Sequence, residues 1–185
     1  MSCLLVTVAS AARATEQLYH VDPEHTYPSF EADHMGGLSV WRGKFNRSSG
    51  TVTLDLDKQT GSVDIVVDTS SIDFGNDALN EHAQGAEMFA VDKYPTAHYT
   101  GRLDAFVDGA PTRVQGELTL RGVTQPLELQ ITKFQCKTHP MAHKPVCGAD
   151  ATATFKRDSY GLDYGVAWGF DQTVTLRIQI EALAE

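Results

Sequence analysis

The 185-residue sequence lacks the features that mark several large classes of protein. It has no run of about 20 consecutive apolar residues, the length that a helix needs to cross a bilayer. Lysine and arginine number 15 against 24 aspartates and glutamates, for a formal net charge of −9, and they form no basic stripe. An acidic chain of this kind is a poor ligand for nucleic acid, so we expect no nucleic-acid partner.

Motifs of the common enzyme classes are missing as well. The sequence contains no G-x-S-x-G, no H-E-x-x-H and no phosphate-binding P-loop. The acids Asp55 and Asp57 fit solvated strand and turn positions better than an acid–base pair. His34 shares strand parity with Phe30 and should point inward, where a histidine is more often a hydrogen-bonded core residue than a ligand contact or a catalyst. We therefore expect no catalytic residue, no metal and no cofactor.

The sequence has only three cysteines, and whether they form a disulfide or bind a metal depends on the compartment that the protein occupies. Leu4 to Ala9 is a short apolar run followed by Ala12-Arg13-Ala14, the pattern of a secretory signal peptide. No basic residue precedes the run, so an ordinary buried segment or a frayed strand is the alternative. We expect residues 1–14 to be a signal peptide and residues 15–185 to be one exported, soluble domain.

The segment CKTHPMAHKPVC holds the two cysteines that export would leave, Cys136 and Cys147. An even cysteine count in an exported chain favours a disulfide. His139 and His143 lie between the cysteines, so a zinc site with four ligands is the alternative. Structural zinc sites usually draw their ligands as two close pairs separated by a longer spacer, which makes this crowded loop a poorer match.

Alternation of apolar and polar residues dominates the remainder, as in half-buried antiparallel strands. In TVTLDLD, for example, Val52, Leu54 and Leu56 share one face. The turn at Gly122 joins two alternating runs as a tight hairpin. These features predict an all-β sandwich or an up-and-down barrel, and a closed barrel would leave no exposed edge strand. The alternating runs cover residues 51–57, 62–68, 117–120, 127–134 and 173–182.

One segment breaks the alternation and predicts a short helix from Asn76 or Asp77 to Gln84. Asn76 is a favourable N-cap residue and Gly85 can end the helix. Leu79 and His82 give the helix an apolar side. An insertion of this kind in a β protein either forms a functional lid over an opening or only closes the core, and both interpretations stay open.

Three segments together resemble the YceI-like family. They are VDPEHTYPSFEADHMGG followed by GKF, DTSSIDFGNDALNEHAQGAEMFAVDKYPTAHY, and GELTLRGVTQPLEL. The resemblance implies a lipocalin-like antiparallel β-barrel of about eight strands, exported to the periplasm of a bacterium. It implies an apolar tunnel that holds a polyisoprenoid chain, such as an isoprenoid quinone or another prenyl lipid. The run after Cys147, CGADA, is similar to a branch with a cysteine pair, which strengthens the disulfide interpretation.

Strand parity, the helix and the family motifs together nominate nine ligand-binding residues. They are Phe30, His34, Phe45, Leu79, His82, Phe89, Tyr99, Leu118 and Leu129. The helix departs from the more basic run of the family at Asn80, Glu81, Ala83 and Gln84, which favours a neutral head group over a diphosphate.

Three function classes stay open. A periplasmic carrier of isoprenoid-type lipids leads, followed by a structural or stress-response protein whose barrel is filled by side chains, and then by a metal-binding or enzymatic protein that uses the Cys-His loop. As partners of a carrier we expect the amphiphilic lipid itself, transient contact with the inner membrane or a quinone-using membrane protein, and a second copy in a homodimer.

Overall fold

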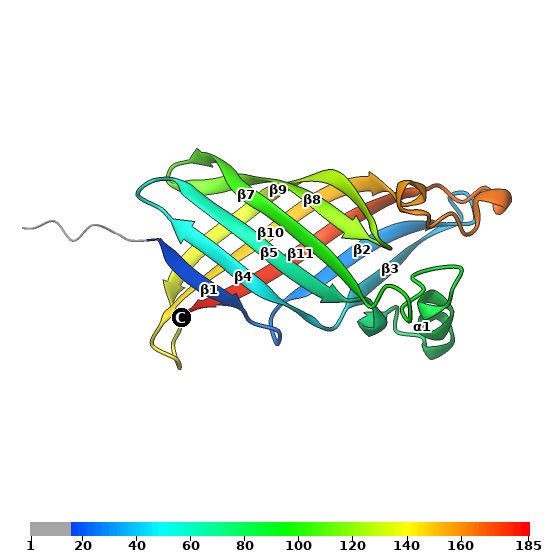
Figure 1. The fold of residues 1–185 in the computed structure, drawn as a ribbon, viewed down its shortest axis with the longest axis horizontal. Helices are drawn as coiled ribbons and strands as arrows, with labels where there is room; N and C mark the ends of the chain where they lie inside the picture. Colours follow the sequence, from blue (N-terminus) through cyan, green and yellow to red (C-terminus); the bar gives the residue numbers. More distant parts are fainter. Residues whose placement is uncertain (1–15) are drawn as a thin grey trace, which may run out of the picture.

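The computed structural model describes residues 16–185, so the predicted signal peptide at residues 1–14 lies outside the described residues. Eleven strands form one antiparallel sheet that curls into an elongated barrel (Figure 1). The strands are β1 (Gln17–Val21), β2 (Tyr27–His34), β3 (Ser39–Phe45), β4 (Ser48–Asp55), β5 (Thr60–Asp68), β6 (Ile72–Asp73), β7 (Thr96–Val107), β8 (Ala110–Leu120), β9 (Val123–Thr138), β10 (Pro145–Lys156) and β11 (Thr173–Ala184).

The barrel closes through the last strand. Its eight strands follow the order β1-β4-β5-β7-β8-β9-β10-β11, and β11 pairs back onto β1. β10 covers one edge of β11 along its whole length. The other edge pairs with β2 from Val174 to Gln179 and with β1 from Ala182 to Ala184. This is the closed antiparallel barrel that the sequence and the family resemblance predicted.

Strands β2, β3 and β6 extend the barrel wall at one end. β2 pairs with β3, and β3 pairs with β6 at Phe45 and Ile72. Only two residues separate β3 from β4, and the short 3-10 turn Thr69–Ser71 separates β5 from β6. The extended end carries the β2–β3 hairpin, helix α1 (Asp77–Gln84) and the loop 157–172, as Figure 1 shows. We call this end the mouth.

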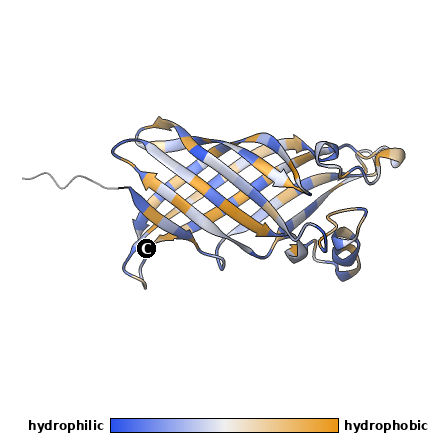
Figure 2. Cartoon of the chain, in the orientation of Figure 1, coloured by the Kyte–Doolittle hydropathy of each residue, from blue (hydrophilic) through white to orange (hydrophobic). Residues whose placement is uncertain are grey.

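The predicted alternation is visible along the strands (Figure 2), because hydrophobic and hydrophilic residues follow one another across the wall. One expectation at the end of β4 was wrong. Leu56 does not continue the inward face of Leu54, because the strand ends at Asp55 and Leu56 is 41% exposed in the turn. Asp55 in turn is not solvated. It is buried and accepts hydrogen bonds from the backbone N–H and the ammonium of Lys58 at 2.9 and 2.6 Å, which pull its pKa below the usual range.

Helix α1 begins and ends where the sequence predicted. The Asn76 side chain accepts a hydrogen bond from the Leu79 N–H at 3.0 Å, and Gly85 is the C-cap residue. Ala83 is 1% exposed and packs against the barrel end, while Gln84 donates to the carbonyl of Ser70. No helix within residues 16–185 is long and apolar enough to cross a membrane.

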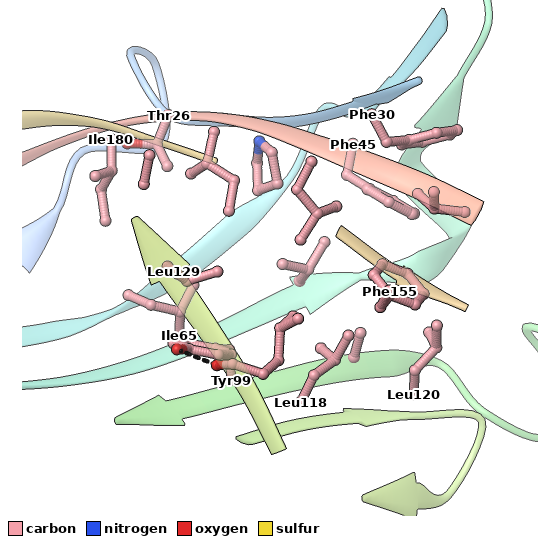
Figure 3. A pocket seen from close by; sticks show the side chains of 18 of the residues that line it. Thr26, Phe30, Phe45, Ile65, Tyr99, Leu118, Leu120, Leu129, Phe155 and Ile180 are labelled. Carbon is pink, nitrogen blue, oxygen red and sulfur yellow. Dashed lines mark hydrogen bonds between the residues drawn. The ribbon is translucent and has the colours of Figure 1, made fainter. Parts of the chain in front are cut away.

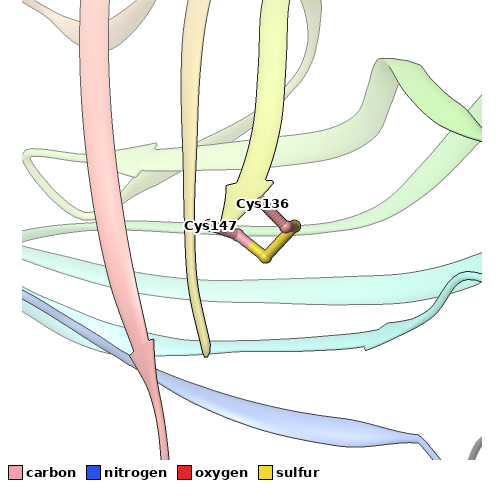
Figure 4. The surroundings of a disulfide bond; sticks show 2 residues. All are labelled: Cys136 and Cys147. Carbon is pink, nitrogen blue, oxygen red and sulfur yellow. A yellow bond between two sulfur atoms is a disulfide. The ribbon is translucent and has the colours of Figure 1, made fainter. Parts of the chain in front are cut away.

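Cys136 and Cys147 form a disulfide, which confirms the pairing expected from the sequence (Figure 4). The two cysteines lie directly opposite each other on β9 and β10, with their Cα atoms 4.0 Å apart. Both thiols are engaged in the bond, so a zinc site with His139 and His143 loses its two sulfur ligands. The disulfide joins β9 and β10 close to the hairpin that connects them, and this hairpin lies at the barrel end opposite α1 (Figure 1).

We predict that reduction destabilises the barrel without opening it. A loop of this size is worth about 3 kcal/mol in the chain-entropy model, so the free energy of unfolding should fall by up to that amount. Urea unfolding with and without reductant measures the change. The Cys136→Ala/Cys147→Ala variant is the control and should not respond to reductant. An unchanged unfolding midpoint of the reduced wild-type protein would contradict the prediction.

Candidate ligand-binding cavity

The barrel is hollow. An apolar cavity of about 390 Å³ runs along its axis, within the range of pockets that hold small molecules. All eight strands of the barrel contribute inward side chains to its wall, as do β2, β3 and α1. In Figure 3, Phe30 and Phe45 on one side face Phe155 and Leu120 on the other across the open interior.

All nine residues nominated from the sequence line this cavity. Phe30, Tyr99 and Leu129 are buried in its wall, and Leu118 is half-buried beside them. The other five lie toward the mouth, where Phe45 packs against Phe89 with ring centroids 5.5 Å apart. The structure therefore brings the nine residues together around one space, and their contact with a ligand stays a prediction.

Two polar side chains of the inner cavity, those of Thr26 and Tyr99, already have hydrogen-bond partners. Thr26 is 1% exposed and its hydroxyl donates to the carbonyl of Glu181. Tyr99 donates to the carbonyl of Leu127 at 2.8 Å. The phenol end of its ring lies over Gly116, where an added Cβ would come within 2.5 Å of the phenol oxygen. Burial raises the pKa of Tyr99, so the phenol stays neutral at physiological pH. Such a surface suits a hydrocarbon tail.

The charged residues and the histidines of the lining gather at the mouth instead. Asp33 and His34 come from the end of β2, and His82 comes from α1. Arg157 and Tyr164 come from the loop that follows β10. The cavity is therefore apolar at depth and polar at its opening, which is the arrangement that matches an amphiphile with its tail inside.

Arg157 is the residue at the mouth that the sequence analysis missed. It is 8% exposed, and it donates to the carbonyls of Leu162 at 2.8 Å and Tyr164 at 2.7 Å. Within residues 16–185 no carboxylate lies within 4 Å of its guanidinium. Burial lowers its pKa, yet a guanidinium keeps its charge at neutral pH. Two of its five N–H donors serve these carbonyls. No periodicity in FKRDSYG distinguishes this arginine from an exposed one.

The two mouth histidines are held by aromatic contacts. His34 stacks on Trp41 with ring centroids 4.0 Å apart and meets the edge of Phe170 at 5.4 Å. His82 meets Tyr164 edge-to-face at 4.7 Å, and its buried Nε2 has no hydrogen-bond partner in the described part of the chain. His82 Nε2 is therefore an unpaired polar atom of the mouth within the described part of the chain.

Comparison with known proteins fixes the family. The model of the YceI-like domain matches residues 19–182. The chain belongs to the YceI-like family. It is 29% identical to the protein YceI of Salmonella arizonae over 190 aligned residues. The alignment covers 100% of this chain and 95% of that protein.

Solved structures share the fold. A YceI protein of Campylobacter jejuni superposes with a TM-score of 0.68 at 20% identity, over 80% of this chain and 87% of that one. A polyisoprenoid binding domain from Saccharophagus degradans, implicated in plant cell wall breakdown, gives a TM-score of 0.65 at 16% identity, over 90% of this chain and 98% of that one. At these identities the likeness shows the YceI-like barrel and not the ligand.

We predict that the Asp33 carboxylate holds the two loops of the mouth together. This carboxylate accepts the backbone N–H groups of Asp171, Gly36 and Gly37 at 2.9, 2.9 and 2.6 Å, which joins the β2–β3 hairpin to the loop 157–172. The substitution Asp33→Ala should speed amide hydrogen exchange at these three positions. It should also shift the fluorescence of Trp41 and Trp168, the only two tryptophans of the chain, which both line the mouth. Unchanged exchange there would contradict the prediction, and Asp57→Ala at the opposite end is the control.

The carboxylates of Asp33 and Asp171 predict how acid affects the mouth. The Asp171 N–H and the two glycine N–H groups hold the pKa of Asp33 below its usual range, and the hydrogen bonds from Thr173 lower the pKa of Asp171 to about 2. A carboxylate with a depressed pKa stabilises the folded state above its unfolded pKa, and the contribution is lost as the pH falls toward the folded value. The mouth should therefore loosen between about pH 4 and pH 2, which tryptophan fluorescence measures. A signal that is flat across this window would be the contrary result.

Proposed function

We propose that this protein binds and carries a long-chain lipid of the isoprenoid class, with the tail in the barrel and the head group at the mouth. The observation that supports the proposal most strongly is the closed barrel around a cavity of about 390 Å³ whose polar lining gathers at one end. A filled barrel would leave no such space. The Saccharophagus relative described as a polyisoprenoid binding domain supports the choice of lipid class.

The affinity comes from the tail in this proposal. Each methylene of a tail that leaves water contributes about 0.8 kcal/mol before the cost of ordering the chain. The inner wall can bury a tail without forming a hydrogen bond to it, since the hydroxyls of Thr26 and Tyr99 already bond backbone carbonyls. Several related tails can therefore bind in the same barrel.

The mouth gives the head group a place to bond. Arg157 and His82 can donate to a carbonyl, hydroxyl or phosphate oxygen at the opening. The proposal therefore covers a neutral head such as a quinone as well as an acidic one such as a prenyl phosphate. The protein acts by binding in this account, and no side chain is assigned a catalytic step.

The proposal includes export to the periplasm. Disulfides form and persist in oxidising compartments, and the bond between Cys136 and Cys147 supports this location. There the protein would carry the lipid between membranes or to a membrane protein that uses it.

Native mass spectrometry of protein isolated from its own cells without detergent tests the function directly. We expect an excess mass that corresponds to one lipid molecule and that disappears when the protein is denatured. Protein that carries no lipid in cells, and binds neither an isoprenoid quinone nor a prenyl phosphate afterwards, would contradict the proposal.

We predict that narrowing the cavity impairs binding more than stability. Leu129 is buried in the wall, so Leu129→Trp places an indole in the space that the tail would occupy. Overpacking a filled core costs about 1–3 kcal/mol, but a hollow barrel can take the ring. The matched control is Gln130→Trp, because Gln130 is exposed on the outer face of the same strand.

The measurement compares binding of an isoprenoid quinone with the melting temperature of both variants. The expected result is a loss of binding in Leu129→Trp with little change in melting temperature, and near wild-type values for Gln130→Trp. A Leu129→Trp protein that only melts earlier, with no quinone binding by the wild type to lose, would contradict the carrier proposal.

A further inference from the structure

Large apolar side chains are exposed around the mouth of the barrel. Five of the eight large hydrophobic residues that are exposed within residues 16–185 lie there. We call these five the mouth patch: Met35 (54% exposed), Leu38 (72%), Val40 (52%), Val166 (50%) and Trp168 (62%). Large apolar side chains that are exposed together at one end of a protein mark an interaction surface, whereas apolar residues scattered singly over a surface are ordinary.

The mouth patch is carried by two tips that touch. Met35 and Leu38 lie in the turn of the β2–β3 hairpin, and Val40 lies on its return strand. Val166 and Trp168 form a short 3-10 turn in the loop 157–172. Asp33 accepts the Asp171 N–H, and a Cβ added to Gly36 would lie 3.1 Å from the carbonyl oxygen of Gly169. The tips project from the end of the barrel (Figure 1), and the tip of the loop 157–172 is hydrophobic in Figure 2.

Aromatic rings connect the mouth patch with the inside of the barrel. Trp168 belongs to the patch and also lines the cavity. Successive ring centroids lie between 4.0 and 6.3 Å apart along the series Trp168, Phe170, His34, Trp41, Phe74 and Phe30. A lipid tail that entered at the patch would therefore touch aromatic surface all the way to the deep cavity.

We propose that the mouth patch docks the protein end-on onto a lipid bilayer, so that the lipid passes between membrane and barrel without crossing water. This inference rests on the proposed function, because it assigns the route by which that ligand enters. Tryptophan suits the interface between head groups and acyl chains, where its ring is buried and its N–H stays hydrated.

A bilayer fits the mouth patch better than a second protein does. A standard protein interface takes about 20–30 residues from each partner, and the patch offers five on two narrow tips. Two projecting tips can insert between head groups, whereas they leave gaps against a rigid surface. Because the formal net charge of the chain is −9, an anionic membrane surface repels it. The docking is therefore apolar, and neutral lipid is its preferred surface.

Flotation with vesicles of phosphatidylcholine alone, without any cargo lipid, tests the docking. The test variant is Leu38→Glu/Val166→Glu, which places one carboxylate on each tip and changes no residue of the cavity lining. The control is Met141→Glu, because Met141 is 82% exposed on the β9–β10 hairpin at the opposite end. We expect wild type and Met141→Glu to float alike, and the double variant to bind vesicles at least about tenfold more weakly.

Transfer of a bound isoprenoid quinone to the same vesicles tests the route. The rate should rise with vesicle concentration for the wild type, and should become slow and independent of vesicle concentration for the double variant, whose affinity for the quinone in solution is unchanged. Equal flotation of the double variant, or a wild type that does not float, would overturn the inference. So would a wild-type dimer that the double variant converts to a monomer in light scattering, since the patch would then be a dimer interface. A wild type that floats but never binds lipid would overturn the proposed function and leave the docking in place.

Discussion

The structure depends on how the two edges of β11 are covered. β10 takes one edge, and β1 and β2 share the other, so no strand of the eight-membered ring is left unpaired. Closure at eight strands also fixes the diameter, and a barrel of this size is just wide enough for inward side chains to fill it or for one ligand to fit. Here most of the inward side chains are aliphatic, and they surround a cavity of about 390 Å³.

The two ends of the barrel serve different purposes. At one end the hairpins are short, and the disulfide ties β9 to β10. At the other end the hydrogen bonds of Asp33 and Arg157 hold two loops around an opening. Buried polar groups usually find partners, and deep in the cavity Thr26 and Tyr99 each bond a backbone carbonyl. The charged side chains and the histidines of the lining lie at the mouth, and this difference would give a bound amphiphile one orientation.

Sequence reasoning succeeded where a local rule decides the outcome. Alternation identified the inward faces of the strands, and the N-cap residue Asn76 located α1. Alternation alone did not decide between a hollow and a filled barrel, because the pattern is the same in both. It also misplaced Asp55 and Leu56, since the end of a strand depends on the turn that follows it. Arg157 and the aromatic contacts at the mouth come from loops far apart in the chain, and no periodicity reports such contacts.

The central claim is that the barrel interior is a space for a lipid tail. A crystal structure at high resolution of the protein isolated from its own cells, without added detergent, tests this claim most directly. The account predicts continuous, elongated electron density from the mouth near Arg157 inward past Phe30 to Leu129. Side chains that close together across the interior, or ordered water molecules bonded to one another along it, would contradict the account.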